Sequence, residues 1–223
     1  MKNQTIAVVY TSLGGLVNNM KGQLTQAFPG WNIVNIADDS LIREVMAHGG
    51  VTECVRSRLM HYFEAAAQMK PQLIISACSS VGEVAEEADG LFGAPVMRID
   101  RAMIETALSV GNRIGVLASL ETTLLPTVSY IERLAQAAGR NVTVTARVAK
   151  GAYEANSTGD AQTHDRLIME EALKIAPMVD VILLAQGSMA KMEAPLREQT
   201  GLPVYSSPSL CVAAAEKMLK GEE

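Results

Sequence analysis

The residue best placed for chemistry is Cys78, which lies in the segment LIISACSSVG at 73–82. The apolar run is typical of a buried strand, and the cysteine follows it among small residues. A thiol reacts as its thiolate, and the start of a helix favours such an anion through backbone N–H groups and the positive end of its dipole. If the strand ends near Ala77 and a helix begins around Ser80, Cys78 is a reactive thiol beside a turn that can hold an anion.

The remaining cysteines and the histidines do not form a second centre in the sequence. Cys54 and Cys211 lie in helix-like segments and are expected to be inert buried residues. The chain has no CxxC pair and an odd number of cysteines, so a disulfide framework is not expected. The three histidines are not paired at helical spacing, and we therefore expect no metal site.

Composition narrows the range of partners. The chain has 223 residues, a formal net charge of −5 and 48% hydrophobic residues, which is typical of a globular protein. Without a basic cluster, a nucleic-acid role is not expected, and a small metabolite is the expected partner. No apolar run has the length that a membrane span needs, and the N-terminal segment lacks the features of a signal peptide, so we expect a cytoplasmic protein.

The elements that must position Cys78 follow an alternating pattern. Short apolar runs at 6–10, 73–77, 114–118 and 181–185 predict buried parallel strands. Helical patterns lie between them, for example at 55–69 and 165–176. Strands that alternate with helices predict an α/β fold with a parallel sheet, in which ligands bind beyond the carboxyl ends of the strands.

The same pattern occurs twice, with an offset of 108 residues. The matches are Ile6 with Ile114, Val8 with Val116, Arg58-Leu59 with Arg166-Leu167, Ala77 with Ala185, and the Gly-x-Pro-Val segment at 93–96 with that at 201–204. Four separate places keep one offset, which indicates an internal duplication. Two similar halves that face each other are expected to enclose one cleft. At that offset the counterpart of Cys78 is Gln186.

These features together resemble the aspartate/glutamate/hydantoin racemase superfamily. The resemblance rests on the duplicated α/β halves, the Gly-Gly turn in TSLGGL (11–16), a cysteine after one strand and a short polar turn after its mate. It implies two flavodoxin-like parallel-sheet halves related by pseudo-twofold symmetry, with the active site in the cleft between them. In that family one cysteine from each half flanks the substrate's α-carbon, one removing a proton while the other donates one. No cofactor is used, and relatives are commonly oligomers.

The resemblance also implies roles and boundaries for this chain. Cys78 matches the first family cysteine, and Ser79 and Ser80 stand where polar residues hold a substrate carboxylate. Ser12 and Thr122 are expected at equivalent substrate-facing positions after their strands. The turn that usually carries the second cysteine holds Gln186, Gly187 and Ser188. The last helical segment is expected to join the first half, which gives domains of 1–98 plus 206–223 and 99–205.

The missing second cysteine leaves the reaction open, because the Gln186 amide cannot carry a proton at neutral pH. Ser188 is one alternative donor, acting through a water, and Asp100, Tyr153 or His164 would be others. His164 lies in a polar stretch at 155–165 that predicts a surface loop and cap. A reaction that needs a single donor is a further alternative, as in the arylmalonate decarboxylases, which resemble this family but keep the cysteine of the other half.

We therefore expect a cofactor-independent isomerase of the racemase type, in which Cys78 moves a proton at the carbon next to a carboxylate. The alternatives are a single-cysteine decarboxylase and a ligand-binding protein without catalysis. The substrate is expected to be a small carboxylate, for whose second acidic group Arg98 and Arg101 are candidates. A homo-oligomer is expected from the resemblance. Glu83, Glu86 and Glu87 are expected to form a solvated helix face.

Overall fold

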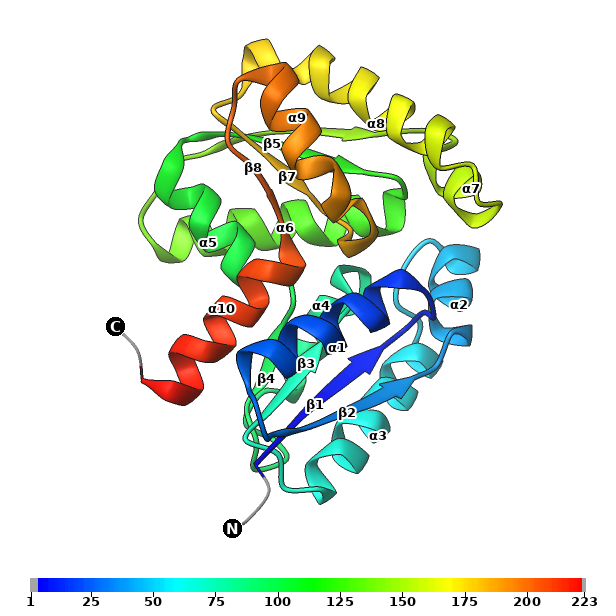
Figure 1. Cartoon of the computed structure of the whole chain (residues 1–223), viewed down its shortest axis with the longest axis vertical. Helices are drawn as coiled ribbons and strands as arrows, with labels where there is room; N and C mark the ends of the chain where they lie inside the picture. Colours follow the sequence, from blue (N-terminus) through cyan, green and yellow to red (C-terminus); the bar gives the residue numbers. More distant parts are fainter. Residues whose placement is uncertain (1–3, 222–223) are drawn as a thin grey trace. The chain divides into compact units, whose positions relative to one another are not determined.

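The computed structural model describes residues 4–221, which form two compact units (Figure 1). One unit runs to Arg101 and also includes the chain from Pro208 onward, and the other spans Ala102–Ser207. Each unit contains a four-stranded parallel sheet with helices on its faces. The predicted α/β fold with two halves is confirmed, whereas the predicted cleft shared by the halves stays a prediction.

The first unit has the strand order β2-β1-β3-β4. Its strands are β1 (Thr5–Tyr10), β2 (Asn32–Ala37), β3 (Leu73–Ser76) and β4 (Val96–Arg98). Its helices are α1 (Gly15–Ala27), α2 (Ser40–His48), α3 (Glu53–Gln68), the 3-10 turn η1 (Ser79–Val81), α4 (Gly82–Ala88) and α10 (Ser207–Lys220). This order is the flavodoxin-like one, whose ligand sites lie at the carboxyl ends of the central strands.

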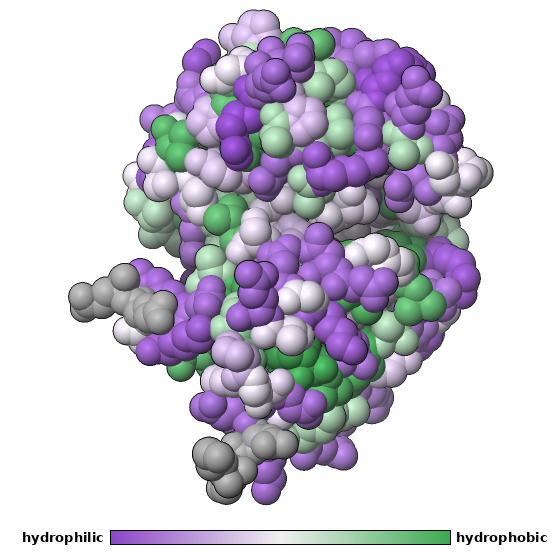
Figure 2. Space-filling model, in the orientation of Figure 1, coloured by the Kyte–Doolittle hydropathy of each residue, from purple (hydrophilic) through white to green (hydrophobic). Residues whose placement is uncertain are grey.

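Alternation along β1 explains how the first unit builds a core on both faces of its sheet. Ala7 and Val9 pack in the cluster that α2, α3 and α4 cover. Ile6, Val8 and Tyr10 pack on the other face, against α1 and α10. Apolar residues are visible over β1 and β2 beside α1 in Figure 2, where this edge of the sheet is only partly covered.

The second unit repeats this arrangement with the order β6-β5-β7-β8. Its strands are β5 (Arg113–Ala118), β6 (Thr143–Val148), β7 (Val181–Leu184) and β8 (Val204–Ser206). Its helices are α5 (Arg101–Val110), α6 (Glu121–Ala137), α7 (Ala152–Ser157), α8 (Ala161–Ile175), α9 (Glu193–Thr200) and the 3-10 turns η2 (Ala176–Met178) and η3 (Gly187–Met192). Buried residues of α8, η3 and α9 form one cluster with β7.

The offset of 108 residues relates strand to strand. It takes the bounds of β1 to those of β5, those of β3 to those of β7, and those of β4 to those of β8. Only the edge strands depart from it, since β6 begins 111 residues after β2. The duplicated pattern in the sequence therefore corresponds to duplicated strand order and to the same positions within each sheet.

Two expectations from the sequence are wrong. The stretch at 155–165 is not a surface loop, because α7 and α8 cover most of it and the His164 side chain is 1% exposed. Its core-facing position on α8 was concealed by the polar residues around it. Cys54 lies in a helix as expected, but it is exposed rather than buried, whereas Cys211 is buried.

Candidate functional site

Cys78 lies directly between β3 and η1, at the carboxyl end of a central strand. Its backbone is extended, with φ −147° and ψ 117°, so the chain turns into the helical geometry only after it. The thiol is held by hydrogen bonds with the Thr11 side chain, with the backbone and side chain of Ser80 and with the Val81 backbone. Such contacts stabilise a thiolate, as expected for a cysteine at the beginning of a helical turn.

Burial outweighs these hydrogen bonds at Cys78. The residue as a whole is partly exposed, yet desolvation is the largest influence on its thiol and raises its pKa above the ordinary value. The hydrogen bonds from Thr11, Ser80 and Val81 lower that pKa, but by less. The protonated thiol is therefore the main form at neutral pH, which suits a proton donor.

Thr11 is the residue of this turn that the sequence reasoning missed. It follows β1 and is 2% exposed, while the predicted contact Ser12 is only partly buried. Because β1 and β3 are adjacent parallel strands, the residue after one lies beside the residue after the other. Ser79 and Ser80 are both buried, at 6% and 3% exposure.

Gln186 occupies the matching position in the second unit, between β7 and η3. Its Oε1 accepts hydrogen bonds from the Ser119 backbone N–H at 2.5 Å and from the Ser119 hydroxyl at 2.8 Å. Ser119 is the counterpart of Thr11 at the offset of 108. The same contact between the residue after the first strand and the residue after the third thus occurs in both units.

These contacts orient the Gln186 amide. A backbone N–H can only donate, so the amide oxygen must face Ser119 and the NH₂ group must point away from it. Among residues 4–221 the Nε2 atom has no hydrogen-bond partner. The turn after β7 therefore offers two N–H donors where the turn after β3 offers a thiol.

The other predicted contacts of the second unit differ in their surroundings. The Thr122 Oγ1 is buried and has no hydrogen-bond partner in the described chain, as expected of a group that awaits a ligand. Gly187 is partly buried and Ser188 is exposed. Ser12 and Thr122 are not equivalent, because the offset of 108 pairs Ser12 with Leu120.

The candidate groups around β4 are engaged in a buried network. Arg98 is 4% exposed and donates to Asp100 through two hydrogen bonds of 2.9 and 2.7 Å. Arg98 also pairs with Glu86, so this glutamate is not simply part of a solvated face. Arg101 is exposed, and Tyr153 is partly buried on α7. The guanidinium of Arg98 is thus occupied by carboxylates of the chain itself.

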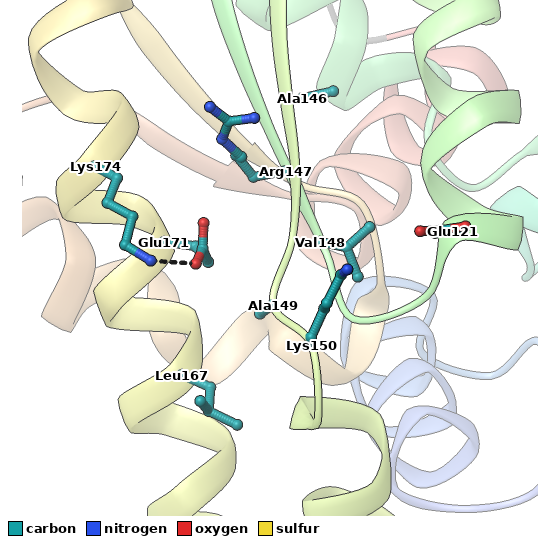
Figure 3. A pocket seen from close by; sticks show the side chains of 9 residues that line it. All are labelled: Glu121, Ala146, Arg147, Val148, Ala149, Lys150, Leu167, Glu171 and Lys174. Carbon is teal, nitrogen blue, oxygen red and sulfur yellow. Dashed lines mark hydrogen bonds and ion pairs between the residues drawn. The ribbon is translucent and has the colours of Figure 1, made fainter.

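A separate polar pocket of about 530 Å³ lies beside the edge strand β6 (Figure 3). Its cations are Arg147, Lys150 and Lys174, and its carboxylates are Glu121 and Glu171. Lys174 pairs with Glu171 at 2.6 Å. Neither Gln186 nor Ser119 lines this pocket, so the turn after β7 takes no part in it.

No group of three or more metal-ligating side chains occurs between residues 4 and 221. Within the same range, no helix has the length and apolar character to cross a membrane.

Comparison with known proteins gives a family and a fold. The Asp/Glu/Hydantoin racemase family description matches residues 17–215. Glutamate racemase from Francisella tularensis, solved with D-glutamate, has a TM-score of 0.76 at 15% identity over 99% of this chain and 82% of that one. Allantoin racemase from Klebsiella pneumoniae has a TM-score of 0.67 at 17% identity, covering 98% of this chain and 88% of that one.

An unliganded arylmalonate decarboxylase has a similar fold as well. Its TM-score is 0.64 at 13% identity, over 99% of this chain and 95% of that one. No curated protein sequence matches the chain. At these identities the solved structures support the fold, while the family description covers most of the sequence.

Proposed function

The chain belongs to the Asp/Glu/Hydantoin racemase family, and from that premise we propose that it is a cofactor-independent enzyme that transfers a proton at the carbon next to a substrate carboxylate. Cys78 is its acid/base group. The observation that carries the proposal is the Cys78 thiol at the carboxyl end of β3, held by Thr11, Ser80 and Val81. Proton transfer needs a group held close to the carbon and donors for the charge that develops on the carboxylate.

The donors in this proposal come from the turns after the strands. The backbone N–H groups at the start of η1 and the hydroxyls of Ser79 and Ser80 hold an anion beside the thiol. Gln186 adds its NH₂ group, and the unpartnered Thr122 hydroxyl adds a further polar contact. Together they favour the substrate's carboxylate and stabilise the negative charge that grows on it during the reaction.

Gln186 also favours a second candidate reaction. An amide donates hydrogen bonds but does not exchange protons with a carbon acid, so Cys78 is the only thiol of the two matched turns. A decarboxylase needs one donor alone: loss of carbon dioxide breaks the bond between the carboxylate and the α-carbon, and the protonated thiol then delivers its proton to that carbon. The raised pKa of Cys78 suits this role.

The experiment that tests both candidates uses deuterium oxide as solvent. L-Aspartate, L-glutamate, a 5-substituted hydantoin and phenylmalonate are incubated with the enzyme, and NMR follows the loss of the α-proton signal while a gas measurement follows carbon dioxide. We expect exchange or decarboxylation with one of these classes, and a loss of about 100-fold or more in Cys78→Ala.

Cys54→Ala is the matched control, because Cys54 is an exposed cysteine on α3 and is expected to leave the rate unchanged. Turnover that survives in Cys78→Ala would remove Cys78 from the mechanism. Binding of these compounds without exchange or decarboxylation would favour a ligand-binding protein instead.

A further inference from the structure

His164 is a buried titratable group that the proposed mechanism does not use. It lies in the first turns of α8, and its side chain is 1% exposed. Its Nδ1 is 2.6 Å from Oδ1 of Asp165, an acceptor that fixes the imidazole with the proton on Nδ1. The Nε2 atom then carries the lone pair, and no residue in the described range forms a hydrogen bond with it.

The same carboxylate links His164 to the turn that holds Gln186. Oδ1 of Asp165 accepts an ion pair from Lys191 at 2.8 Å, and Lys191 belongs to η3, which begins directly after Gln186. Ile168, one turn further along α8, shares a buried cluster with Met189 and Met192 of η3. The first turns of α8 therefore lie against the turn after β7.

The internal repeat shows that His164 replaces an apolar residue. The buried residues of α3 are Val55, Leu59, Phe63 and Ala66, and those of α8 are His164, Ile168, Ala172 and Ile175, with the same spacing. His164 is thus the counterpart of Val55. Val55 packs in the cluster that contacts Cys78, which places the His164 position beneath the equivalent turn of the second unit.

The second unit consequently differs from the first at two matched positions. Where the first has a thiol above a valine, the second has the Gln186 amide above an imidazole. A polar group in a core position has a cost unless it is hydrogen-bonded, so an Nε2 atom without a protein partner indicates a bound water or a ligand. The amide NH₂ of Gln186, also without a partner, provides a second contact for such a water.

We propose that His164 is the proton carrier of the second unit, acting through a water held between its Nε2 and the Gln186 amide. This proposal rests on the proposed function and deepens it, because it supplies the second face that the missing cysteine leaves without a donor. In the forward step Cys78 takes the α-proton as its thiolate, and the water passes a proton to the opposite face of the same carbon. The water regains its proton from Nε2–H of the imidazolium, which becomes neutral and is protonated again from solvent.

The first test needs no substrate. Protein labelled with ¹⁵N in its histidines is studied by long-range ¹H–¹⁵N NMR, with the His164 signals assigned from His164→Asn. We expect the proton on Nδ1 and the lone pair on Nε2, and a displaced Nε2 signal in Gln186→Ala. Gln162→Ala, an exposed substitution on the same helix, is the control that leaves Nε2 in place. An Nε2 signal that Gln186→Ala does not move overturns the proposal.

The second test follows stereochemistry in deuterium oxide, with the compound that the wild-type enzyme exchanges. We expect both enantiomers to form in the wild type, whereas His164→Val, which restores the residue of the first unit, exchanges the α-proton with retention and loses racemisation by about 100-fold. Racemisation that stays intact in His164→Val overturns the proposal. Cys78→Ala separates this result from the proposed function, because it removes exchange on both faces.

Discussion

The environment of Cys78 combines two opposing influences on one sulfur atom. Burial raises the pKa of the thiol, while the hydrogen bonds of Thr11, Ser80 and Val81 lower it. The balance favours the thiol in the free protein. A racemisation that starts with a base needs the thiolate, whereas a decarboxylation that ends with protonation needs the thiol, so this balance bears directly on which reaction the site performs.

The pH dependence of turnover distinguishes these two roles. Because the pKa of Cys78 is raised, the thiol persists above the usual cysteine value of about 8.5. A reaction with Cys78 as proton donor is therefore expected to have a flat rate through neutral pH and to fall only at alkaline pH. A reaction with the thiolate as base should rise over the same alkaline range. The pH profile of kcat, measured for wild type, decides between them.

Removal of the Thr11 hydroxyl tests the contact that the sequence did not predict. Thr11→Val keeps the shape of the side chain but removes a hydrogen bond to a charged group, which is worth about 1.5–3 kcal/mol. We expect the pKa of Cys78 to rise further by about one to two units, with a matching shift in the pH profile of alkylation by iodoacetamide. Thr11→Ser retains the hydroxyl and should stay close to wild type. An unchanged profile in Thr11→Val would show that the contact does not tune the thiol.

At the scale of the elements, the buried network of Arg98 fixes the helical turn after Cys78. A Cβ added at Gly82, the first residue of α4, would overlap the guanidinium of Arg98. That guanidinium cannot move aside easily, because Asp100 and Glu86 both hold it. The position of α4 relative to β4 thus depends on a residue without a side chain.

Gly82→Ala is therefore expected to lower the free energy of unfolding by about 1–3 kcal/mol, the usual cost of forcing extra volume into a packed site. Gly22→Ala is the matched control, since Gly22 is an exposed position inside α1 with open space around its Cα. There the same substitution should raise the free energy of unfolding by about 0.5–1 kcal/mol. Urea titration measures both, and equal stability of the two variants would contradict the prediction.

The elements also show how far the sequence can predict this structure. The runs at 6–10, 73–77, 114–118 and 181–185 were recognisable because strands buried on both faces are continuously apolar. The edge strands β2 and β6 were not predicted, since their half-exposed residues mix polar and apolar types. Their distance from the offset of 108 also hid them from the repeat.

Prediction of the site was limited by contacts between distant residues. Cys78 and Gln186 follow from the repeat, but their partners Thr11 and Ser119 depend on which strands are adjacent. His164 was placed in a loop because ANSTGDAQTHD contains capping and turn residues, although Asp160 caps a helix that already includes the histidine. Local composition described the start of α8 and did not reveal which of its residues face the core.

At the scale of the whole molecule, the two units share strand order and differ at the residue that matters for chemistry. Gln186→Cys restores a thiol at the position where the family usually has its second cysteine. We expect racemisation to increase relative to simple exchange, because a thiol can donate a proton where the amide cannot. Gln186→Ser removes the amide without adding a proton carrier for neutral pH and is the control. Equal ratios of racemisation to exchange in these two variants would contradict a site to which both turns contribute.

The placement of α10 has a consequence for how the chain becomes a protein. Cys211, Val212 and Ala215 from the end of the sequence complete a core that begins with Ile6 and Val8. During synthesis, the first half emerges from the ribosome early but lacks this covering helix until translation has nearly finished. The second half, which is continuous, has its full set of strands available sooner. The half that carries the reactive sulfur is therefore the last to reach its native state in each newly made molecule.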